Sequence, residues 1–300
     1  MKRGLLAGVL AFVVVALIPA VVHAAFPGRN GPLVIGSQYF ARDIEADVFD
    51  VRSITPDGRP GDVGLPSCYD CLSFSDPVVS PDGERLAFRL GNGIGVAAAD
   101  GSGLRALAGL PPGAGSPAWS PDGREIVFAA DGSRTGKTDL FVAPVEVGAP
   151  RQLTDTPGVS ERAPTWGTRP VGDGGLIAYE RARRLWTVHP DGERVRRLTG
   201  REGLDPSFSP HASKIAFVRR SQVYTVGARG GGLNRVTDRG GLSPSWSPNG
   251  RRIAFLRFRG RAGIYRVGPR GRALRRIQRL FADSACGCFS ANSLDWGPRR

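Results

Sequence analysis

The stretch SPSWSPNGRRIAF, residues 243–255, decides the fold, because related stretches occur four more times along the chain. Each copy has a Pro, a bulky apolar residue two positions later in most cases, a turn and an alternating apolar segment. The other copies are DPVVSPDGERLAF (76–88), SPAWSPDGREIVF (116–128), APTWGTRPVGDGGLIAY (163–179) and DPSFSPHASKIAF (205–217). They begin 38 to 47 residues apart, which is the length of a four-stranded propeller blade.

Each copy continues with two further segments of strand character. The first is an apolar alternation: DLFVA (139–143), RLWTV (184–188), QVYTV (222–226) and GIYRV (263–267). After a tight turn comes a short closing segment: RQLTD (151–155), VRRLTG (195–200), NRVTD (234–238) and RRIQR (275–279). Period-two alternation with β-branched and aromatic residues predicts strands, and no long stretch after the N-terminal apolar run has helical periodicity. The sequence therefore predicts an all-β fold.

Two local features of the repeat have clear structural roles. In Ser-Pro-Asp-Gly, Pro121 presets φ, Asp122 bonds its own backbone, and Gly123 takes a conformation awkward for other residues. The aromatic residue before the turn is expected to fill the wedge between neighbouring blades. These wedge residues are Trp119, Trp166, Phe208, Trp246 and Trp296.

The two ends of the chain supply the parts of one more repeat. SLDWGPRR (293–300) has the character of a first strand, and GRNGPLVIGSQ (28–38), DVFDV (47–51) and the turn Pro56-Asp57-Gly58 have that of the remainder. We therefore predict a six-bladed β-propeller of four-stranded blades. Its ring is closed by the C-terminal strand, which joins the N-terminal blade as the innermost strand and leaves no open edge.

Residues 1–24 are typical of a Sec-type secretory signal. Lys2 and Arg3 precede an apolar run from Leu5 to Val22, and Val22 and Ala24 favour cleavage after Ala24. An uncleaved membrane anchor is the alternative. We expect a signal peptide over 1–24, a single propeller domain over 25–300, and a secreted, periplasmic or cell-envelope location.

The net charge is +14, and loss of Lys2 and Arg3 would leave +12. Residues 251–280 contain eleven Arg and no acid. The loops between second and third strands should all emerge on one face of the ring. Their basic residues form the predicted binding face: Arg181, Arg183, Arg184, Arg219, Arg220, Arg257, Arg259 and Arg261.

This basic face suggests docking of an anionic partner. Such a partner would be an acidic envelope protein, an anionic polymer or a lipid headgroup, whereas nucleic acid does not suit the expected compartment. A solvated, Arg-rich surface without a partner is the alternative. We expect a monomer with no membrane span after cleavage.

The four cysteines form two close pairs, CYDC with Cys68 and Cys71, and CGC with Cys286 and Cys288. Disulfides are expected in an exported protein. Local pairing would close very small rings, whereas cross-pairing would lock the seam of the propeller and constrain the unfolded chain more. We favour cross-pairing, with local pairing and a zinc site as alternatives.

The pattern Pro-x-Trp-Ser-Pro-Asp-Gly-x-x-Ile-x-Phe, best seen in residues 116–128 and 243–255, resembles the TolB-like six-bladed propellers, which are WD40-like repeat proteins. The resemblance extends over nearly the whole chain after the signal and includes QVYTV (222–226). It implies an extracytoplasmic binding module. The family's namesake carries an α/β domain before its propeller, and here only a few residues separate the signal from the first strand.

The sequence offers no catalytic or metal-binding motif of known spacing. His-x-His, His-Glu-x-x-His and Gly-x-Ser-x-Gly are all absent. Asp82, Asp122 and Asp191 are interpreted as turn formers. We therefore expect a non-enzymatic scaffold with no cofactor, no metal and no catalytic residue. The alternative is a propeller enzyme, such as a lactonase, hydrolase or lyase acting on a glycan at the central tunnel.

Overall fold

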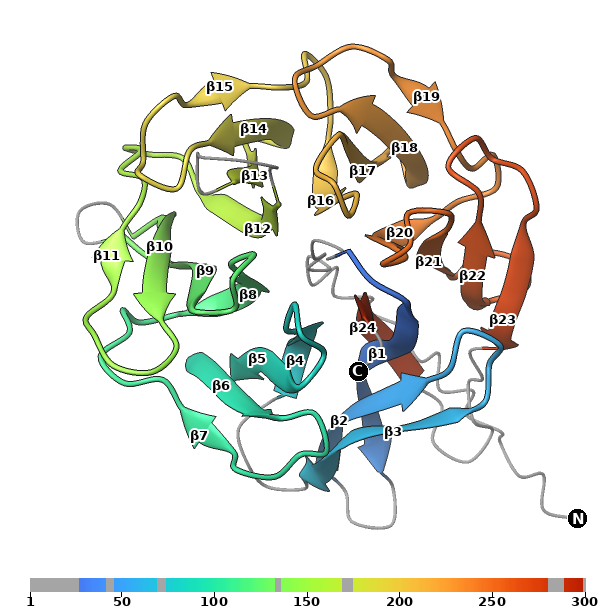
Figure 1. Cartoon of the computed structure of the whole chain (residues 1–300), viewed down its shortest axis with the longest axis horizontal. Coiled ribbons are helices and arrows are strands. Elements are labelled where there is room, and N and C mark those ends of the chain that lie inside the picture. Colours follow the sequence, from blue (N-terminus) through green and yellow to red (C-terminus); the bar gives the residue numbers. More distant parts are fainter. Residues whose placement is uncertain are drawn as a thin grey trace, which may run out of the picture.

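Six antiparallel four-stranded sheets form a ring in the computed structural model (Figure 1). The structure describes residues 27–41, 46–68, 74–132, 136–168, 175–279 and 289–298; the side chains of 37–41, 46–50, 62–68 and 289–292 are not described. Those residues contain strands, turns and bends and no helix. The all-β class and the six blades predicted from the sequence are confirmed.

The blades are numbered in chain order, and the strands of each are given from the axis outward. Blade 1 contains β24 (Phe289–Pro298), β1 (Asn30–Ala41), β2 (Ala46–Ile54) and β3 (Pro60–Cys68). Blade 2 contains β4 (Phe74–Val79), β5 (Arg85–Leu90), β6 (Gly93–Ala98) and β7 (Arg105–Ala106). Blade 3 contains β8 (Gly115–Trp119), β9 (Glu125–Asp131), β10 (Thr138–Pro144) and β11 (Arg151–Gln152).

The remaining three blades repeat the same order. Blade 4 contains β12 (Glu161–Gly167), β13 (Leu176–Arg181), β14 (Arg184–Val188) and β15 (Arg196–Arg197). Blade 5 contains β16 (Leu204–Phe208), β17 (Lys214–Arg219), β18 (Gln222–Gly227) and β19 (Asn234–Arg235). Blade 6 contains β20 (Leu242–Trp246), β21 (Ile253–Arg257), β22 (Gly263–Val267) and β23 (Arg275–Arg279).

The Ser-Pro-Asp-Gly turn joins the first two strands of a blade through its side chains. Ser120 Oγ donates to Asp122 Oδ1 at 2.6 Å and accepts from the Glu125 N–H at 2.9 Å. The Arg124 N–H donates to the same Asp122 oxygen at 3.1 Å, and Gly123 has φ of 69°. The predicted roles of Asp122 and Gly123 are confirmed.

The predicted wedge residues fill the seams between blades, because each is buried against the preceding blade. Trp166 packs with Ala118 and Val127 of blade 3, and Trp296 packs with Ala254 and Leu256 of blade 6. Apolar area removed from water at each seam stabilises the ring by about 25 cal/mol per Å². The apolar core of the described residues is divided into five clusters that lie in the blades and the seams between them.

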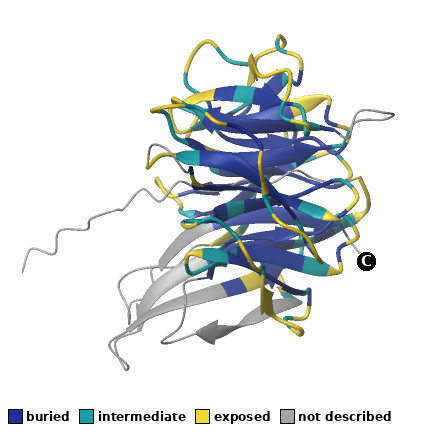
Figure 2. Cartoon of the chain, turned by 90° about the vertical axis from the view of Figure 1, so that its left-hand side faces the viewer, coloured by how far each residue is buried: buried dark blue, intermediate teal, exposed yellow. Residues whose placement is uncertain are grey.

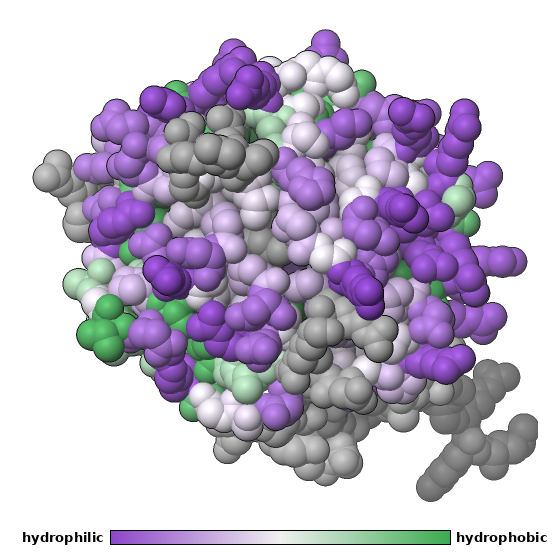
Figure 3. Space-filling model, viewed as in Figure 1, coloured by the Kyte–Doolittle hydropathy of each residue, from purple (hydrophilic) through white to green (hydrophobic). Residues whose placement is uncertain are grey.

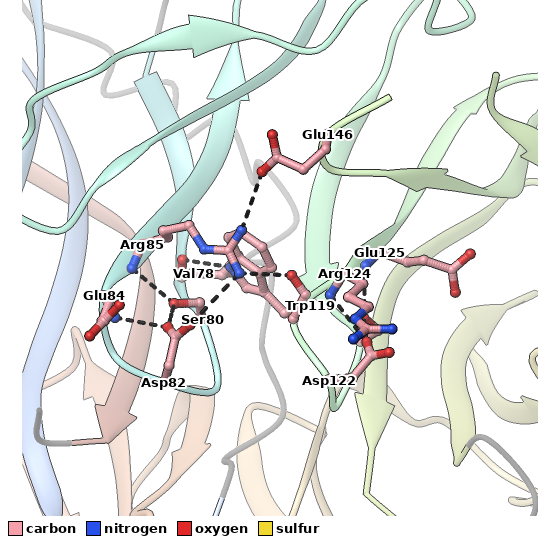
Figure 4. Close-up of polar contacts among 12 residues, drawn as sticks. Val78, Ser80, Asp82, Glu84, Arg85, Trp119, Asp122, Arg124, Glu125 and Glu146 are labelled. Atoms are coloured by element: carbon pink, nitrogen blue, oxygen red, sulfur yellow. Dashed lines mark hydrogen bonds and ion pairs between the residues drawn. The ribbon is translucent and has the colours of Figure 1, made fainter. Parts of the chain in front are cut away.

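Polar groups also cross a seam, as Figure 4 shows between blades 2 and 3. The Arg85 guanidinium lies 4.8 Å from the ring centroid of Trp119 and donates to the Gly123 carbonyl at 2.8 Å. The same guanidinium pairs with Glu146 at 3.7 Å, and the indole N–H of Trp119 donates to the Val78 carbonyl at 3.2 Å. The wedge tryptophan is thus held by a cation on its ring and by a hydrogen bond at its polar edge.

Blade 1 is built from both ends of the chain, as predicted. β24 pairs antiparallel with β1, with Trp296 opposite Leu33 and Leu294 opposite Ile35. The indole N–H of Trp296 donates to the Gly31 carbonyl at 3.2 Å. The C-terminal strand is therefore the innermost strand of a blade whose other strands lie at the N-terminal side of the sequence.

The antiparallel order gives the ring two distinct faces. We call the face where each innermost strand begins the entry face; the loops between second and third strands lie there too. The other face, which carries the Ser-Pro-Asp-Gly turns, is the turn face. Buried strands run between the two faces and exposed residues gather in the loops (Figure 2).

Candidate functional site

The predicted basic residues do not form one uniform surface, because the Glu202 carboxylate pairs with the guanidinium of one of them and accepts a hydrogen bond from the backbone of another. The Arg183 guanidinium pairs with Glu202, and the Arg220 backbone N–H donates to the same carboxylate at 2.6 Å. The hydrogen bond from Arg220 lowers the pKa of Glu202, and the Arg183 guanidinium adds to this effect. These contacts join loops of blades 4 and 5 on the entry face.

Three further predicted arginines pack on aromatic rings of their own blades. The guanidinium of Arg181 lies 4.7 Å from the Trp186 ring centroid, that of Arg219 lies 5.6 Å from Tyr224, and that of Arg257 lies 4.4 Å from Tyr265. Arg257 is only 8% exposed. These stacks of charge on aromatic faces serve packing, so Arg257 in particular offers little surface to a partner.

Arg184, Arg259 and Arg261 remain exposed in the loops of the entry face. Arg184 begins β14, and the other two lie between β21 and β22. Arg183 and Arg220 are exposed as well, so five of the eight predicted arginines lie exposed in entry-face loops of blades 4, 5 and 6.

The predicted disulfides fall outside the described residues. Cys71, Cys286 and Cys288 are not described, and Cys68 is described only as the last residue of β3. The pairing stays a prediction.

A second set of residues, missed in the sequence, surrounds the axis of the ring. In five blades the residue before the repeated Pro has positive φ although it is not glycine. These residues are Asp76 (55°), Ser116 (56°), Ala163 (50°), Asp205 (49°) and Ser243 (47°). Each lies at a register shift between the first two strands. We call this set the axial ring. Non-glycine residues in this conformation are strained and cluster at functional sites.

Two members of the axial ring are carboxylates on opposite blades. Asp76 on β4 and Asp205 on β16 are 5% and 7% exposed, and the two strands lie across the axis from each other (Figure 1). Burial raises the pKa of Asp76 to about 7, although Arg89 opposes this shift. Burial also raises the pKa of Asp205, and the charges of Glu180 and Asp76 raise it further.

Several polar atoms of the innermost strands have no hydrogen-bond partner. They include Asp76 Oδ1, Ser243 Oγ and Ser293 Oγ, and both serines are fully buried. A buried polar atom without a partner costs about 1–3 kcal/mol, so such atoms indicate a site for water or an ion. In the described part of the chain no three His, Cys, Asp or Glu residues cluster as metal ligands.

A pocket of about 350 Å³ lies between blades 3 and 4, lined by Thr154, Thr156, Tyr179 and Arg181 among others. Glu161 beside it is fully buried, pairs with Arg181 at 3.8 Å and accepts from Thr156 Oγ1 at 2.9 Å. Burial raises the pKa of Glu161. Glu161 and Arg181 form an ion pair, so these two residues present no unpaired charge to the pocket.

Solved structures with the same architecture identify the fold. TolB from Acinetobacter baumannii superimposes with a TM-score of 0.66 at 18% identity, over 91% of this chain and 68% of that one. A protein described as TolB from Agrobacterium tumefaciens gives 0.62 at 19% identity, over 84% and 90%. In fold, the chain is a TolB-like propeller.

The TolB-like fold is shared with proteins of other kinds. A chain of a nidogen/laminin complex superimposes with a TM-score of 0.62 at 12% identity, over 89% of this chain and 98% of that one. No sequence-family description matches the chain, and no curated protein matches it. At these identities the likeness establishes the architecture, and the function has to be argued from the sites.

Hydropathy is distributed unevenly over the face shown in Figure 3, where strongly hydrophilic side chains crowd the rim and the centre is of intermediate hydropathy. Among the described residues no helix has the length and apolar character to cross a membrane.

Proposed function

We propose that this TolB-like propeller acts outside the cytoplasm as a non-enzymatic binding scaffold of the cell envelope. The signal-like residues 1–24 support export, and 25–300 are taken as one domain. An anionic partner docks on the entry face. The observation that carries this proposal is the exposure of Arg184, Arg259 and Arg261 on that face.

The fold supports a binding role, because TolB-like architecture also occurs in a nidogen/laminin complex. The arginine positions support an anionic partner, because exposed guanidinium groups of one sign steer and orient carboxylates and phosphates. The Arg183–Glu202–Arg220 cluster holds adjacent entry-face loops together, so part of the surface is ordered before binding. Such preorganisation reduces the entropy lost on docking.

A charge-reversal experiment tests the proposal. The triple variant Arg184→Glu/Arg259→Glu/Arg261→Glu is compared with Arg194→Glu/Arg229→Glu/Arg270→Glu, which changes exposed turn-face arginines by the same net charge. The probe is a poly-glutamate peptide, and its affinity is measured by fluorescence anisotropy at several salt concentrations. We expect the entry-face variant to lose about tenfold or more in affinity and most of its salt dependence.

The matched variant separates a site from general attraction. It should keep the wild-type affinity within about threefold, because charges beyond a Debye length of about 10 Å are largely screened. Equal losses in both variants would show that only the overall charge matters. No binding by the wild type at low salt would also reject the docking face.

The second candidate function, an enzyme acting on a glycan at the axis, is favoured by Asp76 and Asp205. Two carboxyl groups with raised pKa values suit acid–base chemistry. Their exposures of 5% and 7% leave little surface for a sugar ring to contact. We therefore prefer the scaffold, and loss of a measured hydrolase or lyase activity in Asp76→Asn would reverse that preference.

A further inference from the structure

Exposed aliphatic side chains gather in one kind of turn of the blades. Among the described residues six large apolar side chains are exposed, and five of them lie in the turn between the third and fourth strands of a blade. These five are Leu104, Val147, Val195, Leu233 and Leu274. In an antiparallel blade this turn emerges on the same face as the turn between the first and second strands. All five side chains therefore belong to the turn face.

Neighbouring blades are connected through these turns, which fixes their positions on the face. The Arg151 guanidinium, at the start of β11, donates to the Pro190 carbonyl in the turn of blade 4 at 2.8 Å. In the same way the Asn234 side chain, at the start of β19, donates to the Pro269 carbonyl of blade 6 at 3.2 Å. Neighbouring side chains of an extended segment point to opposite sides. Leu233, directly before Asn234, is accordingly left in solvent, beside the turn of blade 6.

The turn face is basic at blades 5 and 6. Four turns emerge there, and none contains an acid: 209–213, 228–233, 247–251 and 268–274. Six exposed arginines lie in these turns or within two residues of them: Arg229, Arg235, Arg251, Arg270, Arg272 and Arg275. Among the described residues none of the six forms an ion pair. Leu233 and Leu274, 53% and 46% exposed, lie among them, and we call these eight residues the turn-face patch.

At blades 2 and 3 the turn face is different, because acids and arginines are mixed there. The exposed acids are Asp82, Glu84, Asp122 and Glu146. Arg85 and Arg105 both pair with Glu146, at 3.7 and 3.1 Å. An anionic surface is therefore attracted to the patch and not to blades 2 and 3, although Leu104 and Val147 are exposed there.

The combination of side chains in the patch selects the kind of partner. Leucines surrounded by basic residues match the boundary of an anionic bilayer, where apolar groups enter the acyl region and cations meet the lipid phosphates. Arginine is well suited to phosphate because its guanidinium donates two parallel hydrogen bonds. The leucines stand on adjacent turns of the same face, so one flat surface can contact both.

We propose that the turn-face patch docks the propeller on an anionic lipid bilayer, with Leu233 and Leu274 inserted among the headgroups and the six arginines at the lipid phosphates. This surface is separate from the entry face and does not depend on the docking proposed there. A propeller that lies on a bilayer by its turn face keeps its entry face directed away from the lipid. Both surfaces can therefore be occupied at once.

Sedimentation with lipid vesicles tests the patch. Residues 25–300, which contain every described strand, are used so that the apolar run of residues 5–22 cannot insert. Vesicles of phosphatidylcholine are compared with vesicles in which about one third of the lipid is phosphatidylglycerol. We expect the wild type to partition at least about tenfold more strongly onto the anionic vesicles, and this preference should weaken as salt is added.

The leucines are tested without any change of charge. Leu233→Ser/Leu274→Ser should lower the partition onto anionic vesicles by about tenfold, because it removes the inserted apolar groups. Leu104→Ser/Val147→Ser removes exposed aliphatic side chains from the same kind of turn in blades 2 and 3 and should bind like the wild type. All four side chains are exposed, so urea unfolding of both variants should match the wild type.

The two charge-reversal variants introduced above test which face binds the lipid. Arg194→Glu/Arg229→Glu/Arg270→Glu should lose most of the preference for anionic vesicles, whereas Arg184→Glu/Arg259→Glu/Arg261→Glu should retain it. The same variants are expected to behave in the opposite way with poly-glutamate. A failure of the lipid surface is therefore distinguishable from a failure of the entry face.

Three results would overturn the proposal. The first is a wild type that binds both kinds of vesicle equally. The second is equal partition of Leu233→Ser/Leu274→Ser and Leu104→Ser/Val147→Ser, since the patch would then make no apolar contact with the bilayer. The third is an equal loss in the two charge-reversal variants, since overall charge would then explain the attraction.

Discussion

At the scale of single residues, Asp295 connects blade 1 to both of its neighbours. Its Oδ2 accepts from the Val79 N–H of blade 2 at 3.0 Å, and its Oδ1 accepts from Ser245 Oγ of blade 6 at 3.2 Å. Ser245 Oγ in turn accepts from the Trp296 N–H at 3.0 Å. The residue before each wedge aromatic can thus join its blade to the next, as Ser207 also does with the Trp246 N–H at 3.4 Å.

Asp295 should make stability depend on pH. Burial raises its pKa from 3.8 to about 7, although the Val79 N–H and Ser245 hydroxyl oppose the shift. The folded state therefore binds the proton more tightly than the unfolded state. The group stabilises the fold below about pH 4, and this contribution is lost as the pH rises through about 7.

Asp295→Asn keeps an acceptor oxygen and does not ionise. As the pH rises from about 5 to about 8, its free energy of unfolding should therefore fall less than that of the wild type. Urea unfolding at both pH values measures the difference, and Asp100→Asn on an exposed turn should follow the wild type. Identical pH profiles for wild type and Asp295→Asn would contradict the prediction.

At the scale of strands, the sequence overestimated the outermost strands of blades 3, 4 and 5, whereas RRIQR (275–279) forms a strand throughout as β23. RQLTD, VRRLTG and NRVTD were predicted as strands, yet only the two-residue strands β11, β15 and β19 form within them. The threonine ends the pairing, because its hydroxyl takes the place of a backbone acceptor. Thr154, Thr199 and Thr237 accept from the backbone N–H of Leu140, Leu185 and Val223 at 2.9, 3.0 and 2.9 Å.

Thr237→Val should destabilise the protein by about 1–2 kcal/mol, because it keeps the shape and leaves the buried Val223 N–H without this acceptor. Thr237→Ser restores the hydroxyl and should recover most of the loss. Urea unfolding of the three proteins provides the measurement. A Val variant as stable as the wild type would show that the hydroxyl is dispensable to the outer strand.

At the scale of the whole molecule, ring closure depends on the last strand. β24 supplies Leu294 and Trp296 to the core and Asp295 to two seams, and the Trp296 indole reaches Gly31 at the other end of the sequence. Without it, β1 would become an exposed edge beside unfilled seams.

Deletion of residues 293–300 should therefore destabilise the whole domain, with a loss above about 4–5 kcal/mol. Limited proteolysis and near-ultraviolet circular dichroism should show disruption of all blades. A synthetic peptide of residues 289–300 added to the truncated chain should restore protection. A deletion that changes only the cleavage of blade 1 would contradict this view of closure.

Local sequence was sufficient for the blades. Turn chemistry at Ser120, Asp122 and Gly123, the alternation of apolar residues in the strands and the wedge aromatics all act over a few residues. The first-strand pattern of residues 293–300 and the remaining strands of the same repeat near the N-terminus indicated how the ring closes. These features predicted the class, the six blades and the strand exchange of β24.

Only the tertiary structure decided what the charged residues do. Arg257 is covered by Tyr265 of its own blade, Arg183 and Arg220 meet at Glu202, and Asp76 and Asp205 are buried on the innermost strands of opposite blades. Each outcome depends on which loops and strands meet in space, and burial then sets the cost of every charge. A single sequence shows residue types and spacing, whereas these distances and desolvation effects arise when the six blades close around the axis.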